Sequence, residues 1–176
     1  EYRRQRQMCI RDRAIADLSS NKNVVTASSL TYSSDGTFSF NGSSDYMIFP
    51  ENSALNTQTP TVEVWVKTNA TSQNGFWFEK GNVNTSYSLF QEGGNIVWRT
   101  CNSNSPPYDS LYATSSSYLS TSAWAQVVGT YSSGDKRIYI NGAQVTNNTA
   151  SGTIATNANG SSIGVYGGYN LSLIHI

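Results

Sequence analysis

The sequence predicts an all-β protein. Short runs of β-branched and aromatic residues alternate with turn-forming clusters of Ser, Asn and Gly along the 176 residues. No stretch keeps a helical period, and only 12% of the residues are charged. Many short strands between polar turns are typical of a sandwich or a barrel.

The first strands follow from the alternation of side chains. "TFSF" places Phe38 and Phe40 on one face, and Asn41-Gly42 then turns the chain into "DYMIFP" at 45–50. "TVEVWVK" at 61–67 is the clearest strand, since its two faces differ completely in character. Three valines lie on one face and three other residues on the opposite one: Val62, Val64 and Val66 against Glu63, Trp65 and Lys67.

The middle and last strands are shorter. "GFWFEKG", "SYSLFQEGG" and "NIVWRTC" follow in order, and simple alternation makes Trp77 face away from Phe76 and Phe78. Residues 102–118 are the least regular, and "NSNSPPYDS" reads as an exposed loop because Pro cannot serve a central ladder. "WAQVVGTY" and "KRIYING" resume strands, Asn141-Gly142 predicts a hairpin, and "SSIGVYGG" begins the last strand.

The two ends of the chain look unlike the rest. "RRQRQMCIRDR" can be encoded by DNA that closes with GATGTGTATAAGAGACAG, and "LSLIHI" by its reverse complement, CTGTCTCTTATACACATC. This word resembles a transposon end used as a sequencing adapter. We expect residues 1–13 and 171–176 to be translated adapter on an environmental sequence, and residues 14–170 to be the domain. The alternative is a genuine basic arm and an apolar tail.

Setting the ends aside excludes several classes of function. Residues 14–170 hold six basic and nine acidic side chains, a formal charge of −3, which argues against nucleic acid as a partner. No His remains, and Cys101 is the only Cys, so a disulfide, a His–Cys zinc site and a His-activated nucleophile are excluded. No apolar run approaches the roughly 18 residues of a membrane span.

Six segments in order resemble a known family: "FSFNGSSDYMIFP", "TVEVWVK", "FEKG", "WAQVVGTY", "KRIYINGAQV" and "SIGVYGG". They are similar to the laminin-G-like jelly-roll domains of the concanavalin A-like lectin/glucanase superfamily. The resemblance implies two antiparallel sheets packed face to face, with a curved concave face and rim loops. It also implies that Trp65 and Trp124 pack in the core.

The resemblance further implies a missing strand. The family continues after I-G with a strand that returns beside the N-terminal one, whereas this chain continues with "LSLIHI". We therefore expect a sandwich without its C-terminal strand, with an unpaired edge beside the gap. Leu173, Ile174 and Ile176 can pair there without the native pattern.

Catalysis and metal binding find little support. Retaining glycoside hydrolysis needs two carboxyl groups about 5–5.5 Å apart, and the superfamily's glucanases place theirs at E-x-D-x-x-E, whereas Glu63 has no second acid on its strand. We expect no enzyme activity, with a glucanase-like hydrolase as a distant alternative. Calcium is compatible with Asp45, Asp109 and Asp135, but no ligand cluster supports it, so no cofactor is predicted.

Sugar binding is the leading expectation. Such modules stack aromatic rings on pyranose faces, and the candidate ligand-binding residues are Trp77, Trp98, Arg99 and Tyr108. For Trp77 and Trp98 a packing role fits equally well. We expect a non-catalytic recognition module of a larger extracellular, cell-surface or virion-associated protein, with a glycan or an extracellular protein surface as partner. The alternative is a structural or protein-adhesion module without sugar affinity.

Overall fold

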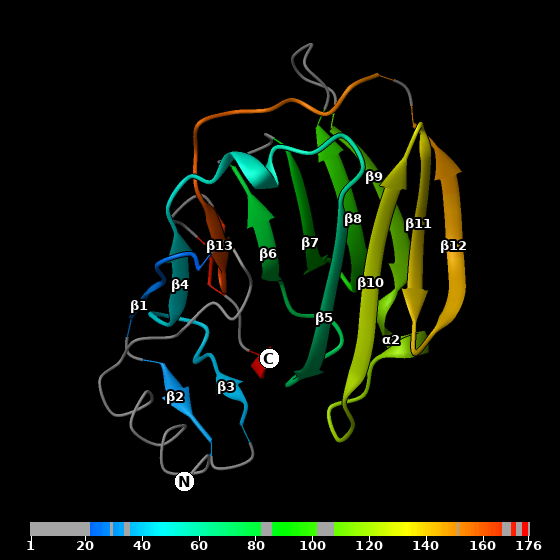
Figure 1. Cartoon of the computed structure of the whole chain (residues 1–176). Coiled ribbons are helices and arrows are strands. Elements are labelled where there is room, and N and C mark those ends of the chain that lie inside the picture. Colours follow the sequence, from blue (N-terminus) through cyan, green and yellow to red (C-terminus); the bar gives the residue numbers. More distant parts are fainter. Residues whose placement is uncertain are drawn as a thin grey trace, which may run out of the picture.

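The computed structural model of the chain describes residues 22–28, 30–33, 36–81, 86–101, 108–150, 152–166, 170–171 and 174–175. Two antiparallel sheets of seven strands pack face to face, which confirms the all-β sandwich (Figure 1). Residues 1–13, expected to be adapter-derived, lie outside the described residues. None of the described helices is long and apolar enough to cross a membrane.

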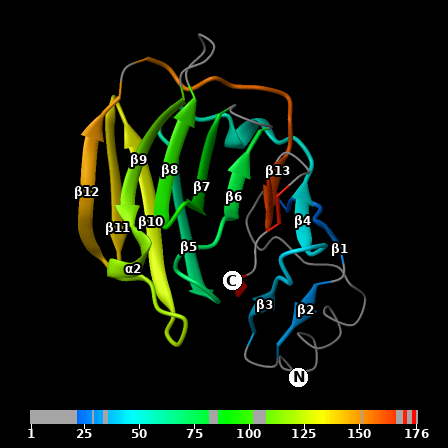
Figure 2. The same ribbon diagram turned by 180° about the vertical axis from the view of Figure 1, so that it is seen from behind.

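The first sheet has the order β1-β4-β13-β6-β7-β8-β9. Figure 2 shows it from its outer side, with β8 and β9 in front of β10. This sheet contributes Met47 of β4, Trp77 of β6, Leu89 of β7, and Ile96 and Trp98 of β8 to the apolar cluster between the two sheets. Phe40, which precedes β4, belongs to the same cluster. The strands are β1 (Thr26–Ser28), β4 (Tyr46–Phe49), β13 (Ser161–Ile163), β6 (Gly75–Lys80), β7 (Tyr87–Glu92), β8 (Asn95–Cys101) and β9 (Tyr108–Thr114).

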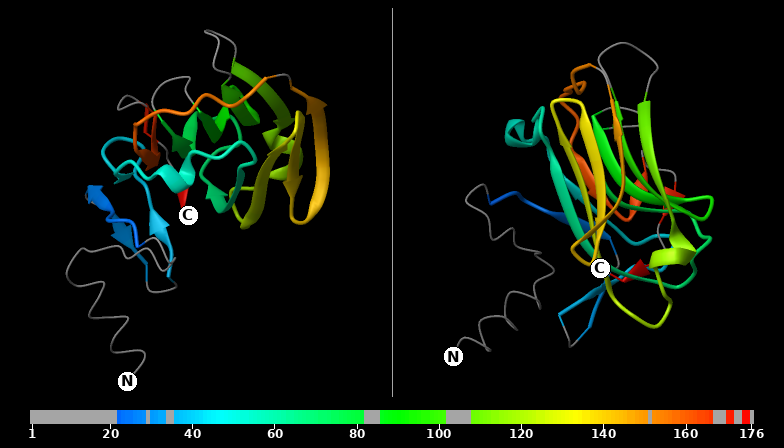
Figure 3. Two further views of the ribbon diagram at one scale, coloured as in Figure 1. Left: turned by 45° about the horizontal axis from the view of Figure 1, so that its top comes forward. Right: turned by 90° about the vertical axis from the view of Figure 1, so that its right-hand side faces the viewer.

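The second sheet has the order β12-β11-β10-β5-β16-β3-β2. Figure 3 shows the two layers from the side. A two-stranded sheet, β14 (Val165–Tyr166) with β15 (Asn170–Leu171), and two short helices, η1 (Ser53–Leu55) and α2 (Ser115–Tyr118), complete the described elements. The second sheet's strands are β12 (Ala143–Thr149), β11 (Asp135–Ile140), β10 (Ala125–Ser132), β5 (Thr61–Thr68), β16 (Ile174–His175), β3 (Phe38–Ser39) and β2 (Thr31–Tyr32).

One predicted hairpin turn is confirmed, and one predicted loop is wrong from Tyr108 onward. Asn141 and Gly142 have φ values of 50° and 80° and join β11 to β12, as a tight type I′ hairpin requires. The irregular segment predicted for 102–118 is instead ordered from Tyr108 onward, as β9 and α2. Alternation in "LYA" explains the strand, because Leu111 and Ala113 are buried and Tyr112 is exposed.

The described partners of β5 differ between its two sides. Along Thr61–Val66 this strand pairs with β10, and on its other side the described residues pair with it only at Lys67 and Thr68. That short contact comes from β16, in which Ile174 stands opposite Thr68. Ile174 therefore pairs there as anticipated, whereas Leu173 and Ile176 lie outside the described residues.

Candidate functional site

A β-bulge in β6 decides where its three aromatic side chains lie. The register against β7 shifts between Phe76 and Phe78, so two consecutive residues of β6 face the same side. Trp77 and Phe78 both contact the cluster between the sheets, whereas Phe76 lies on the outer face with Phe90. The prediction that Trp77 faces away from Phe78 is therefore wrong. With 0% exposure, Trp77 has no surface to offer a sugar.

Trp98 is also a packing residue. Its ring is fully buried, and its indole Nε1 donates a hydrogen bond of 3.0 Å to the Thr130 carbonyl oxygen of β10. The ring thereby links the two sheets across the core, and it lies so close to Gly129 that a Cβ there would be 2.5 Å from the indole Cδ2. Of the two roles open for Trp77 and Trp98, the structure supports packing, because neither ring has exposed surface for a sugar.

Arg99 lies on the opposite face of β8 from Trp98, and contacts with Phe90, Ser110 and Glu92 help to hold its side chain. Its guanidinium carbon is 4.6 Å from the centroid of the Phe90 ring, and Nε donates to Ser110 Oγ at 3.2 Å. Nη2 is 3.6 Å from a carboxylate oxygen of Glu92. Phe90 in turn stacks on Phe76, with ring centroids 4.3 Å apart. Arg99 is therefore fixed in orientation over an aromatic pair.

Tyr112 adds an exposed ring beside Arg99. The register of β8 and β9 places Tyr112 opposite Val97 and Ser110 opposite Arg99, so Tyr112 and Arg99 are diagonal neighbours on one face. The Tyr112 side chain is 51% exposed. We call Glu92, Arg99, Ser110 and Tyr112 the Arg99–Tyr112 surface. The sequence does not single out Tyr112, because the prolines at 106 and 107 favour a loop over its segment.

Tyr108, the fourth predicted site residue, is the first residue of β9. Its backbone pairs with that of Cys101 at the end of β8. Its side chain is outside the described part of the structure, so its role in sugar binding stays a prediction.

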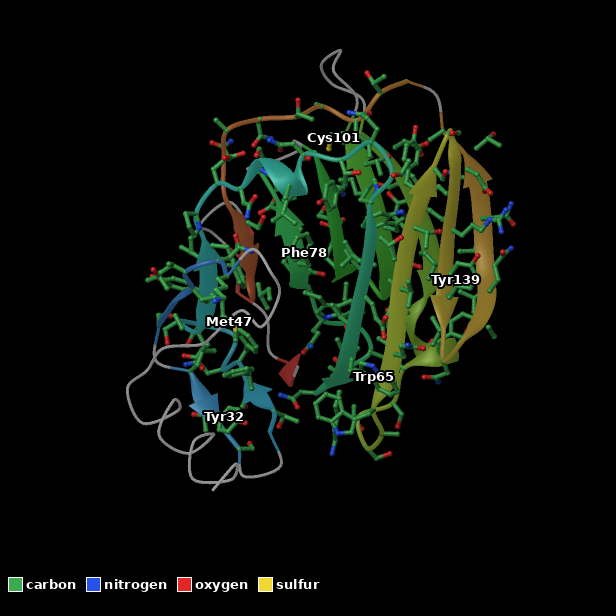
Figure 4. The ribbon with its side chains drawn as sticks, in the orientation of Figure 1. Tyr32, Met47, Trp65, Phe78, Cys101 and Tyr139 are labelled. Carbon is green, nitrogen blue, oxygen red and sulfur yellow. The ribbon has the colours of Figure 1, made fainter. Side chains whose placement is uncertain are left out.

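Trp65 is the other large exposed aromatic residue on a long strand. The expectation that it packs in the core is wrong: 53% of its surface is exposed, on the outer face of β5 (Figure 4). Gln126 of β10 stands opposite it and donates from Nε2 to a Glu63 carboxylate oxygen at 2.6 Å. The alternation in "TVEVWVK" placed Trp65 with Glu63 and Lys67, and the structure agrees with that pattern. Trp124, the other expected core residue, is half-buried.

A cleft of about 320 Å³ lies at the rim, where the turn between β10 and β11 meets the loops around Gln58 and Gly152. Its two largest polar side chains, Tyr131 and Gln58, already bond to the protein. Tyr131 donates its hydroxyl to the Gly152 carbonyl at 2.9 Å, and the Gln58 amide both donates to and accepts from the Ile154 backbone. Since Tyr131 is buried, the cleft offers no exposed aromatic ring. It is a weaker sugar site than the Arg99–Tyr112 surface.

The three acids compatible with calcium each have a protein partner. Asp45 accepts a hydrogen bond from the Asn41 backbone N–H, and Asp135 pairs with Arg137. Asp109 lies on β9, 3.7 Å from the Lys136 ammonium nitrogen. Burial lowers the pKa of Lys136 to about 8, and Asp109 partly opposes that shift. Within the described ranges, no group of three or more His, Cys, Asp or Glu residues could hold a metal ion.

Similar structures support the fold. The chain resembles the receptor-binding domain of botulinum neurotoxin C/D mosaic serotype (20% identity, TM-score 0.75) and the binding domain of botulinum neurotoxin serotype D (20%, 0.74), covering 92% of this chain and 43% of each of theirs. The binding domain of botulinum neurotoxin DC, in complex with SialylT, matches at 13% identity and a TM-score of 0.71, over 93% of this chain and 43% of that one. The chain thus spans less than half of each domain.

Family membership rests on a sequence match. No curated protein matches the chain. A laminin G family model, described as "Concanavalin A-like lectin/glucanases superfamily", matches residues 41–171, which is most of the chain and includes both β5 and the Arg99–Tyr112 surface. The chain therefore belongs to the concanavalin A-like lectin/glucanase superfamily.

Proposed function

We propose that this domain is a non-catalytic module that binds a glycan through the Arg99–Tyr112 surface. The observation that carries the proposal is the half-exposed Tyr112 ring next to an arginine held in one orientation by Phe90, Ser110 and Glu92. A ring of this kind offers an apolar face to the C–H face of a sugar. The guanidinium, hydroxyl and carboxylate beside it can bond to sugar hydroxyls.

The arrangement of these groups favours binding for an energetic reason. The Arg99 side chain is only 10% exposed and already ordered, so a ligand that touches its exposed part orders few further rotamers. The botulinum neurotoxin domain in complex with SialylT lends general support. Because more than half of that domain lies outside the match, it carries no weight for the position of the site.

The module belongs, in this proposal, to a larger protein. We place the module in a larger extracellular, cell-surface or virion-associated protein, as its family and its receptor-binding neighbours suggest. The competing function is structural or protein-adhesive, without sugar affinity. A glucanase-like activity is the distant third, and release of reducing sugar from β-glucans by the purified chain would establish it.

The test is glycan-array binding by the whole chain, with and without calcium. Wild type should bind at least one glycan class, and Tyr112→Ala should weaken binding about tenfold or more, equivalent to about 1.4 kcal/mol. Trp65→Ala is the matched control, because it removes an equally exposed aromatic ring from the other sheet. Absence of binding by a folded wild type would favour the structural role and contradict the proposal.

A further inference from the structure

A lysine, an asparagine and an aspartate meet near the edge of the sandwich that β9 and β12 form. Lys136 of β11 and Asn148 of β12 stand directly opposite each other in the ladder, so their side chains lie on the same face of the second sheet (Figure 1). That face is the inward one, because Lys136 is fully buried and Ile138, two residues along β11, belongs to the core cluster. Asp109 reaches both side chains from β9 of the first sheet.

The carboxylate of Asp109 contacts both partners. Its Oδ2 is 3.7 Å from Lys136 Nζ, and its Oδ1 accepts a hydrogen bond of 3.5 Å from Asn148 Nδ2. Lys136 Nζ also donates to the Asp109 carbonyl oxygen at 2.5 Å. At the other end of the amide, Asn148 Oδ1 is buried and has no hydrogen-bond partner in the described part of the chain. The amide group therefore lies beside a buried amine and a carboxylate that can carry a proton between them.

The surroundings favour the neutral form of this amine. Burial is the largest effect and lowers the pKa of Lys136 to about 8; Asp109 and Cys101 oppose the shift, and Arg99 adds to it. Burial also raises the pKa of Cys101 to about 11, so its thiol stays uncharged below that pH. Tyr131 of β10 stands opposite Lys136 and donates its hydroxyl to a backbone carbonyl. A desolvated, neutral lysine amine is a nucleophile.

We propose that Lys136 and Asn148 react after folding to form an intramolecular isopeptide bond, with Asp109 as the proton carrier. The neutral Nζ of Lys136 attacks Cγ of Asn148, and an Nζ–Cγ bond forms. Asp109 takes the proton that Nζ releases and passes it to Nδ2, whereupon the Cγ–Nδ2 bond breaks and ammonia leaves. The product is a secondary amide, and the carboxylate is regenerated without any oxidant or co-reactant. Until the reaction occurs, Lys136 titrates as a free amine.

The bond has two physical consequences for the sandwich. It replaces an amine that is costly to bury in its charged form by a neutral amide. It also fastens β12, the edge strand of the second sheet, to β11, which protects an otherwise exposed edge from fraying. The Asp109 side chain is 28% exposed, which gives ammonia a route to solvent. The inference is independent of glycan binding, because Asp109 faces inward on β9 whereas Tyr112 faces outward.

The experiment is peptide mass spectrometry of the whole chain, incubated at pH 6 or pH 9 and then digested with trypsin in urea. Trypsin does not cleave after an acylated lysine. The bond therefore yields one branched species that joins the peptide ending at Arg137 to the peptide beginning at Ile138, lighter by one ammonia than the two together. With a pKa of about 8, the neutral fraction of the amine is about 1% at pH 6 and about 90% at pH 9, so the bond should form about a hundredfold faster at pH 9.

Three variants, each checked for folding by circular dichroism, separate the reaction from other chemistry. Asn148→Asp should abolish the branched species, because a carboxylate does not accept the amine, and Asp109→Asn should slow its formation at least about a hundredfold. Asn147→Asp is the matched control, since this neighbouring asparagine is exposed and stands opposite Arg137 on the outward face, and it should leave the rate unchanged.

Two kinds of result would overturn the proposal. The first is a folded wild type that gives only linear peptides after several days at pH 9, including one that loses ammonia without forming the branch, since that loss would come from another asparagine. The second is a branched species that persists in Asn148→Asp or forms at the wild-type rate in Asp109→Asn.

Discussion

Replacing Gly129 by Ala tests the position of Trp98. Two physical effects of this change act on the free energy of unfolding in opposite directions. Gly129 lies inside β10, and glycine in a strand interior is less favourable than alanine by roughly 0.5–1 kcal/mol. Backbone preference alone would make Gly129→Ala stabilising. However, the added Cβ would lie 2.5, 2.7 and 3.0 Å from three atoms of the Trp98 indole, well inside normal contact distances.

The ring has little room to move. It is fully buried, and its Nε1 is tied to the Thr130 carbonyl of the same strand. Overpacking of a core site costs about 1–3 kcal/mol, and a bulky ring held by a hydrogen bond belongs at the upper end. After the backbone gain is subtracted, we expect a net destabilisation of about 2 kcal/mol. For a domain of this size that lowers Tm by about 4–8 °C.

The assay is thermal or urea unfolding of wild type and Gly129→Ala, followed by Trp fluorescence and far-UV circular dichroism together. In a Trp98→Leu background, Gly129→Ala should cost much less than it does in wild type, because the clash is already gone, although Trp98→Leu is itself destabilising. An unchanged or raised Tm in Gly129→Ala would refute the reasoning. It would mean that Trp98 does not pack against β10, and would return this residue to the candidate site.

Two further predictions concern buried titrating groups. For Lys136 the folded pKa is lowered to about 8 from 10.5, so between these pH values the unfolded chain binds more protons and the contribution of Lys136 to stability rises with pH, by up to about 3 kcal/mol. The unfolding free energy of Lys136→Met minus that of wild type should therefore fall from pH 8 to 10.5 in urea titrations, and a constant difference would disprove the shift. Burial raises the pKa of Cys101 to about 11, so in a Cys9→Ser variant iodoacetamide at pH 8 should label Cys101 only after unfolding, whereas rapid labelling of the native protein would contradict its burial.

Much of the fold was predictable because strands leave a two-residue period. The alternation in "TVEVWVK" predicted which side chains of β5 face the core, including the exposed position of Trp65. The family pattern argued for burial of Trp65 and was the weaker guide. A residue whose two neighbours at i±2 are both charged, as Glu63 and Lys67 are, belongs on the solvent face of a half-buried strand.

The candidate site was harder to predict, for two local reasons. The bulge in β6 adds one residue to the ladder and brings Trp77 to the core side, and "GFWFEKG" carries no signal for it. The prolines before Tyr108 hid the strand that carries Tyr112, because the whole segment was interpreted as one loop. The sequence names Arg99 as a candidate next to Trp98, but its contacts with Phe90, Ser110 and Glu92 join β7, β8 and β9 and carry no sequence signal.

The most direct test of the central claim is a backbone-amide NMR titration of the chain with a glycan to which it binds on the array. Binding at the Arg99–Tyr112 surface predicts that the largest shift changes fall on Arg99, Ser110 and Tyr112, and that Tyr112→Ala abolishes them. Changes centred on the rim cleft around Tyr131 and Gly152, or on Trp65, would contradict the claim.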